Sequence, residues 1–96
     1  MADSKAHVAV ANRLAAQFGT TYNRGAGVDV QTPNVAIEVE TEQTVGEAGR
    51  QLQGHRKPVY VAGTSQAATA AALKCYEGTT IGVMDPNGRI LKKSTR

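Results

Sequence analysis

Tryptophan is absent from the sequence, aromatic residues make up only 4% of it, and Cys75 is the only cysteine. One cysteine cannot form a disulfide within the chain, so nothing indicates an oxidising compartment. No signal-peptide core is visible, and no apolar run approaches the roughly 20 residues of a membrane-spanning helix. We therefore expect a soluble cytoplasmic protein without a membrane partner.

The shortage of large aromatic residues predicts a thin hydrophobic core. The 96 residues suffice for one domain, and segments such as 67–72 supply alanine as the packing residue. Apolar burial contributes about 25 cal/mol per Å², against roughly 1.5 kcal/mol of entropy for each ordered residue. Because the margin is narrow, we expect a homodimer. Cys75, in the alanine-rich helix, is expected to be a small buried residue.

The charged residues divide into an acidic group and a basic surround, with a formal net charge of +3. The acidic group comprises Asp29, Glu38, Glu40, Glu42 and Glu47. The basic residues around or beyond it are Arg24, Arg50, Arg56, Lys57, Arg89, Lys92, Lys93 and Arg96. This division suits a metal-dependent enzyme acting on nucleic acid, because the cation and the phosphates then have separate sites. Evenly solvated charges are the alternative.

The segment 27–40 alternates apolar and polar residues around the turn 32–34, which predicts a β-hairpin. The apolar face would carry Val28, Val30, Val35, Ile37 and Val39. The other face would carry Asp29, Gln31, Glu38 and Glu40. One register places Val30 opposite Ile37 and Asp29 opposite Glu38, and a slip of two residues places Asp29 opposite Glu40.

Either register gathers three carboxylates, and directly opposed like charges destabilise a sheet. A bound cation would reverse the sign of this interaction. Oxygen ligands suit a hard ion such as Mg²⁺, which takes one or two carboxylates, several waters and a substrate phosphate. The alternative is an exposed acidic face whose long side chains spread into water.

A helix is expected to begin at Asp3 or Ser4 and to run to about Phe18, before Gly19. Its buried stripe would comprise Val10, Ala11, Leu14 and Phe18. His7 lies near the start of this stripe, where a histidine is a core or capping residue or, alternatively, a ligand. A strand at 20–23 and the loop 24–27 would follow. Arg24 in that loop is a candidate partner for a phosphodiester, and the alternative is that the loop is a plain turn.

The segment 44–47 resembles a capping box and predicts a second helix that turns Arg50 and Gln51 toward the carboxylates. A buried central strand is expected at 58–63 and a third helix from Thr64 or Ser65 to Lys74. A hairpin around the turn 85–88 completes the order α-β-β-β-α-β-α-β with one more terminal strand. The residues 92–96 are expected to form a flexible basic tail.

This order of elements, together with Gly27-Val28-Asp29, Ala36-Ile37-Glu38-Val39-Glu40 and Gln51, resembles the PD-(D/E)xK nuclease superfamily. Within it, the segments 23–29 and 35–39 are most similar to archaeal-type Holliday junction resolvases. The resemblance implies a restriction-endonuclease-like α/β fold over residues 1–96, with a mixed central sheet flanked by helices. Val28 stands where the family's eponymous proline is expected.

The resemblance also implies roles for the hairpin residues. Asp29 and Glu38 would be the metal-binding carboxylates, and Val39 would offer its main-chain carbonyl to the metal. Glu40 departs from the family pattern, which usually has lysine there. It would act as a third ligand or as a general base, with Lys57 or Arg50 replacing the missing cation.

Two further positions are matched through the resemblance. Gln51 resembles the glutamine that many members carry on the following helix, with Gln53 as the alternative. The first-helix glutamate of the resolvases has no clear equivalent, and His7 is the nearest candidate.

The function implied is that of a metal-dependent endonuclease that hydrolyses DNA phosphodiester bonds with Mg²⁺ or Mn²⁺ and no organic cofactor. DNA would be bound by Arg24, Arg50, Arg56 and Lys57, and a four-way junction is the structure-specific substrate. Two alternatives remain: a non-catalytic domain of the same fold that binds nucleic acid or a protein, and a structural subunit with a solvated acidic face.

Overall fold

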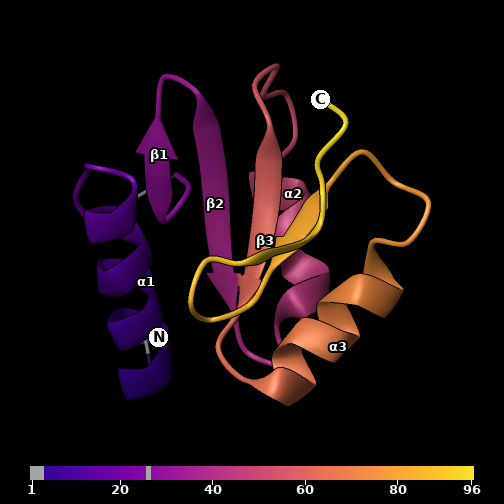
Figure 1. The fold of residues 1–96 in the computed structure, drawn as a ribbon, viewed down its shortest axis with the longest axis horizontal. Helices are drawn as coiled ribbons and strands as arrows, with labels where there is room; N and C mark the ends of the chain where they lie inside the picture. Colours follow the sequence, from indigo (N-terminus) through magenta and orange to yellow (C-terminus); the bar gives the residue numbers. More distant parts are fainter. Residues whose placement is uncertain (1–3, 26) are drawn as a thin grey trace.

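Five strands form one mixed sheet in the computed structural model, which describes residues 4–25 and 27–96 (Figure 1). The strands are β1 (Val30–Thr32), β2 (Val35–Glu40), β3 (Val59–Gly63), β4 (Gly82–Met84) and β5 (Ile90–Lys92), and this is also their order in the sheet. β3 pairs in parallel with β2 and β4, whereas β1 and β5 are antiparallel to their neighbours. The expected α/β class with a mixed sheet is therefore confirmed.

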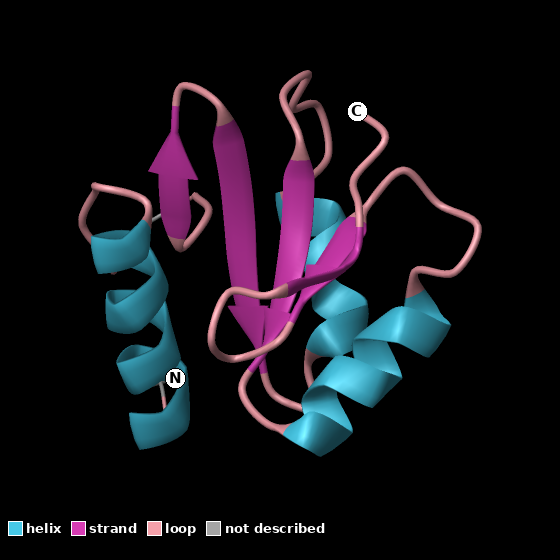
Figure 2. Cartoon of the chain, viewed as in Figure 1, coloured by secondary structure: helices cyan, strands magenta, loops and turns pink. Residues whose placement is uncertain are grey.

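Helices cover both faces of this sheet (Figure 2). They are α1 (Lys5–Gln17), the 3₁₀ turn η1 (Val45–Glu47), α2 (Ala48–Gln51) and α3 (Gln66–Cys75). α1 packs on one face through Val10 and Leu14, against Ile37 and Val39 of β2. α2 and α3 pack on the other face. In the described residues, no helix is long and apolar enough to cross a membrane.

α1 begins and ends where the sequence predicts. The Ser4 hydroxyl accepts a hydrogen bond from the His7 backbone N–H at 3.1 Å, which satisfies one free donor of the first turn. Gly19, with φ of 72°, ends the helix in the left-handed conformation that glycine adopts easily. Asp3, the other cap candidate, lies outside the described residues. Phe18 is partly buried against the core, as expected.

The hairpin has the first predicted register, with Val30 opposite Ile37. β1 begins only at Val30, however, so the alternation does not extend back through Asp29. Val28 was expected beside Val30 but packs on the opposite face of the sheet, in the core cluster that contains Ala36. That part of the prediction is wrong, because side-chain alternation holds only where the backbone is a regular strand.

Residues 20–23, predicted as a strand, form no strand. One backbone bond joins them to the hairpin, from Asn23 N–H to the Asp29 carbonyl at 2.8 Å. The Asn23 side chain also accepts from the Gly25 N–H at 3.0 Å, in the loop that follows. The observed order is thus α-β-β-α-β-α-β-β, one strand fewer than expected.

The second helix is shorter than predicted and has no capping box. The Thr44 side chain makes no cap hydrogen bond and instead accepts from the Thr41 N–H at 3.0 Å. Gly46 and Gly49 weaken helix formation here. The expected apolar residues Val45, Ala48 and Leu52 are buried, so the orientation of the segment is nevertheless confirmed.

β3 is buried along its whole length and lies at the centre of the sheet, as predicted. The Ser65 hydroxyl caps α3 by accepting from the Ala68 N–H at 3.1 Å. Cys75 is exposed, which corrects its predicted burial. The buried stripe of α3 runs through Ala72 to Tyr76, and this spacing leaves Cys75 off the core face.

Residues 92–96, expected to form a flexible basic tail, instead contact the rest of the fold. Lys92 belongs to β5, and Ser94 is buried, with its hydroxyl accepting from the Val59 N–H at 3.1 Å. Arg96 donates from its guanidinium to the Leu52 carbonyl at 2.6 Å. The basic and hydroxyl side chains therefore anchor the segment beside the start of β3, because they satisfy backbone groups there.

Candidate functional site

A cleft of about 900 Å³ lies between the start of α1, the loop before β1, the end of β2 and the η1–α2 segment. It is the place where most of the predicted site residues meet. Those that line it are His7, Arg24, Asp29, Glu38, Val39, Glu40, Arg50 and Gln51. Gln51 lines this cleft, whereas Gln53 is not among its lining residues.

Arg56 and Lys57 are not among the residues that line this cleft. The Lys57 Nζ atom donates to the Thr32 carbonyl at 2.8 Å, at the turn end of the hairpin. Because β2 and β3 run parallel, Lys57 precedes β3 at one end of the sheet while Glu40 ends β2 at the other. Lys57 therefore lies far from Glu40. Of the two residues that the resemblance offers in place of the family's lysine, only Arg50 lines the cleft.

Of the four carboxylates among the described residues that line the cleft, Glu47 is exposed and the other three are buried. Asp29 and Glu40 are each 9% exposed, and Glu38 is 5% exposed. The predicted alternative of long side chains spread into water does not describe them. Buried carboxylates are expensive unless hydrogen bonds or opposite charge compensate them, so this cluster has a stability cost that a purely structural surface would avoid.

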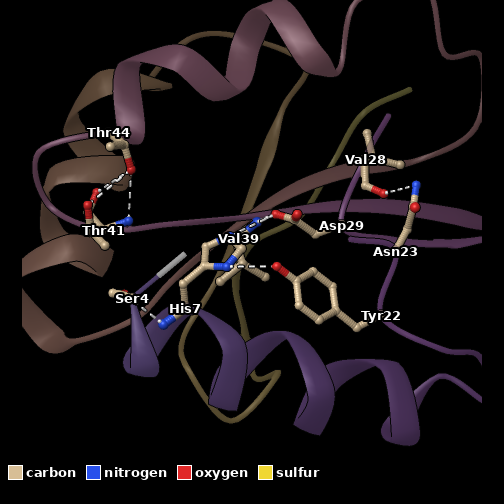
Figure 3. A network of polar contacts seen from close by, with 9 residues as sticks. All are labelled: Ser4, His7, Tyr22, Asn23, Val28, Asp29, Val39, Thr41 and Thr44. Atoms are coloured by element: carbon tan, nitrogen blue, oxygen red, sulfur yellow. Dashed lines mark hydrogen bonds and ion pairs between the residues drawn. The ribbon is translucent and has the colours of Figure 1, made fainter. Parts of the chain in front are cut away.

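The Asp29 carboxylate is held through one oxygen (Figure 3). Its Oδ2 atom accepts from the Val39 backbone N–H at 2.9 Å and lies 3.2 Å from Nε2 of His7. No described residue donates a hydrogen bond to Oδ1. The carboxylate therefore has one oxygen fixed by protein groups and a second that can take a ligand in the cleft.

His7 connects Asp29 to Tyr22. The Tyr22 hydroxyl lies 3.2 Å from Nδ1 of His7, and the two rings are 5.8 Å apart between centroids. An ionised carboxylate only accepts, so Nε2 carries the proton shared with Asp29. In the neutral imidazole, Nδ1 is then the acceptor for the Tyr22 hydroxyl. Figure 3 shows this series of polar contacts, which connects the first turn of α1 to the hairpin.

Burial raises the pKa of Glu40 from 4.5 to about 7. The negative charges of Asp29 and Glu47 raise this pKa further, whereas a hydrogen bond from Thr44 and the nearby His7 lower it. Glu40 therefore exchanges its proton near neutral pH. A carboxyl group of this kind suits proton transfer better than one with an ordinary pKa.

Two arginines belong to the exposed part of the cleft lining, Arg24 and Arg50. The Arg24 guanidinium lies 5.3 Å from the centre of the Tyr22 ring. The loop that carries Arg24 is braced by Asn23, whose side-chain amide donates to the Val28 carbonyl at 3.3 Å. Ala26 of this loop lies outside the described residues. The cleft therefore offers exposed guanidinium groups, which can bind an anion, together with buried carboxylates.

The donor types of the cleft fit a hard divalent cation, since Asp29, Glu38 and Glu40 all offer carboxylate oxygens. Within residues 4–25 and 27–96, however, no three His, Cys, Asp or Glu side chains are grouped closely enough to hold an ion on their own. A cation here would take one or two carboxylates and complete its shell with water or substrate oxygens. The carbonyl of Val39 remains a predicted ligand.

Tyr22 and Thr44 are among the cleft residues to which the sequence patterns give no part in the site. The patterns around them predict a strand for Tyr22 and a helix cap for Thr44. Pairing Tyr22 with His7 requires the position of α1 over the sheet, which no local pattern contains. The glycines that follow Tyr22 were the one available signal that the backbone approaches a site there.

Fold and site together define a small α/β protein with an arginine-bordered cleft of buried carboxylates. Comparisons of the chain with protein-family models, with curated proteins and with solved structures find no match.

Proposed function

We propose that this chain is a divalent-metal-dependent nuclease that hydrolyses phosphodiester bonds in DNA and has a restriction-endonuclease-like fold. The observation that carries the proposal is that Asp29, Glu38 and Glu40 are buried in one cleft to which Arg24 and Arg50 also belong. We further propose that it acts as a homodimer on branched DNA, as its resemblance to Holliday junction resolvases implies.

In this function, Asp29 and Glu38 hold Mg²⁺ or Mn²⁺ together with water. A bound divalent cation lowers the pKa of a water molecule and offsets charge on the scissile phosphate. Arg24 and Arg50 bind and orient the phosphodiester through charge-assisted hydrogen bonds. Gln51 orients the attacking water, and Glu40 accepts its proton on the carboxylate.

The test is incubation of the protein with a four-way junction, a flap, a linear duplex and a single strand. Each substrate is offered with Mg²⁺, with Mn²⁺ and with chelator. We expect cleavage only with metal, and loss of cleavage in Asp29→Asn and Glu38→Gln. Glu77→Gln, which changes an exposed carboxylate that does not line the cleft, serves as the matched control. Metal-dependent cleavage that survives in Asp29→Asn would overturn the proposal.

A second candidate is a non-catalytic nucleic-acid-binding domain of the same fold. It is favoured by one observation: no lysine is among the described residues that line the cleft. This candidate predicts DNA binding that weakens steeply with salt and no cleavage under any condition. It also predicts that Asp29→Asn and Glu38→Gln bind DNA as well as the parent, so the same substrates separate the two functions.

A further inference from the structure

We propose that His7 and Tyr22 are positioning residues that orient the Asp29 carboxylate and thereby set the affinity of the cleft for a divalent cation. The inference rests on the proposed function, because it takes the cleft to bind such an ion. It concerns the residues behind the carboxylate rather than the ligands themselves.

The contacts of the Asp29 carboxylate are asymmetric. This residue precedes β1 and takes no part in the strand pairing, so the ladder does not fix its side chain. The fixing contacts are instead Val39 N–H from β2 and His7 Nε2 from α1, and both reach Oδ2. Because both groups contact the same oxygen, they restrict rotation of the carboxylate. Oδ1 then points away from Val39 N–H and His7 Nε2.

His7 is itself fixed by contacts of its backbone and of its ring. Its backbone N–H is bound by the Ser4 cap, which places it in the first turn of α1. Its ring is 13% exposed, and the Tyr22 hydroxyl contacts Nδ1 on the side away from Asp29. The imidazole is therefore held at both nitrogens and keeps one orientation.

The ring contacts of His7 indicate a positioning role and not direct ligation of the ion. A histidine ligand would offer a ring nitrogen to the ion, but in His7 Nε2 contacts Asp29 and Nδ1 contacts Tyr22. Partners of this kind behind a metal-binding group commonly change metal affinity by roughly 10- to 100-fold. His7 thus acts through Asp29, and Tyr22 acts through His7.

The test measures Mn²⁺ binding to the full chain by titration calorimetry, with no substrate present. We expect His7→Ala to weaken Mn²⁺ binding by about 10- to 100-fold. His7→Gln, whose side-chain amide can donate to Asp29, should recover part of this loss. Tyr22→Phe keeps the ring and removes the hydroxyl, and we expect it to weaken binding several-fold.

Two substitutions serve as matched controls. His55→Ala changes the other histidine, and Tyr60→Phe removes a hydroxyl from a tyrosine of the core; neither residue lines the cleft. Both should bind Mn²⁺ like the parent. Melting in chelator checks the fold, because a merely structural role for His7 would lower the melting temperature without changing the affinity of the folded protein.

The outcomes separate this inference from the proposed function. A parent chain that binds no Mn²⁺ overturns both. A parent that binds Mn²⁺, with His7→Ala and Tyr22→Phe binding equally well, overturns the inference and leaves the proposed function in place. If His7→Ala does not fold, Tyr22→Phe decides, since unchanged binding in this variant overturns the role of the Tyr22–His7 pair.

Discussion

Nε2 of His7 lies 3.2 Å from Oδ2 of Asp29, which joins the first turn of α1 to the residue that precedes β1. The two residues belong to different layers of the fold. Both residues line the cleft, and their contact occupies Oδ2 of Asp29, so Oδ1 is the oxygen available to a ligand. The chemistry of the cleft therefore depends on how α1 docks on the sheet.

Divalent cations should stabilise the folded chain. A ligand that binds only the native state at 100 times its dissociation constant contributes about 2.7 kcal/mol. We expect the melting temperature to rise with millimolar Mn²⁺ or Mg²⁺, as followed by circular dichroism. The rise should be absent in the Asp29→Asn, Glu38→Gln double variant and present in Glu77→Gln. A parent melting temperature unchanged by either ion would contradict this prediction.

The raised pKa of Glu40 predicts a stability that falls with pH. The folded chain keeps this proton up to about pH 7, whereas the unfolded chain loses it near 4.5. Stability from this group is complete below 4.5 and is lost as pH rises through 7. Between pH 5.5 and 8, the free energy of unfolding should fall by about 2 kcal/mol more in the parent than in Glu40→Gln.

The measurement for Glu40 is urea unfolding at both pH values in chelator, since a bound cation would favour the ionised form. Glu77→Gln provides the reference for an exposed carboxylate. Equal pH dependence in the parent and in Glu40→Gln would show that burial does not raise this pKa.

The cleft arginines should dominate binding of DNA. Arg24→Ala and Arg50→Ala are each expected to weaken binding and to reduce the slope of log affinity against log salt by about one. Arg56→Ala is the matched control, because Arg56 is exposed and does not line the cleft. Fluorescence anisotropy in chelator at several salt concentrations measures this. Equal losses in all three variants would contradict the assignment.

The carboxy-terminal segment should contribute to stability. Ser94→Ala leaves the buried Val59 N–H without its acceptor at 3.1 Å, and an unsatisfied buried donor costs about 1–3 kcal/mol. Thr95→Ala, at the exposed neighbouring position, should change stability by less than about 0.5 kcal/mol. Urea unfolding compares the two. Equal stability of both variants would show that the tail is not anchored through Ser94.

Local signals in the sequence were sufficient for several elements. Ser4 and Gly19 delimit α1 because capping and left-handed termination depend on neighbouring residues only. The continuous apolar run of β3 predicts a strand buried on both faces, which is what the structure has. Alternation excludes a slip of one residue in the hairpin, because that slip would turn the apolar face outward. The choice of the Val30–Ile37 pairing over a slip of two residues comes from the structure.

For the site, the sequence determined the residue types and the tertiary structure decided their surroundings. Spacing around one hairpin points to Asp29, Glu38 and Glu40. Period-two geometry places Glu38 and Glu40 in β2, whereas Asp29 precedes β1 and is held by contacts to Val39 and His7. The burial of these carboxylates, the Tyr22–His7 pair behind Asp29 and the distance of Lys57 from Glu40 depend on how separate layers dock. Such contacts join segments far apart in the chain, and their geometry is settled by packing of the whole core rather than by local backbone preference.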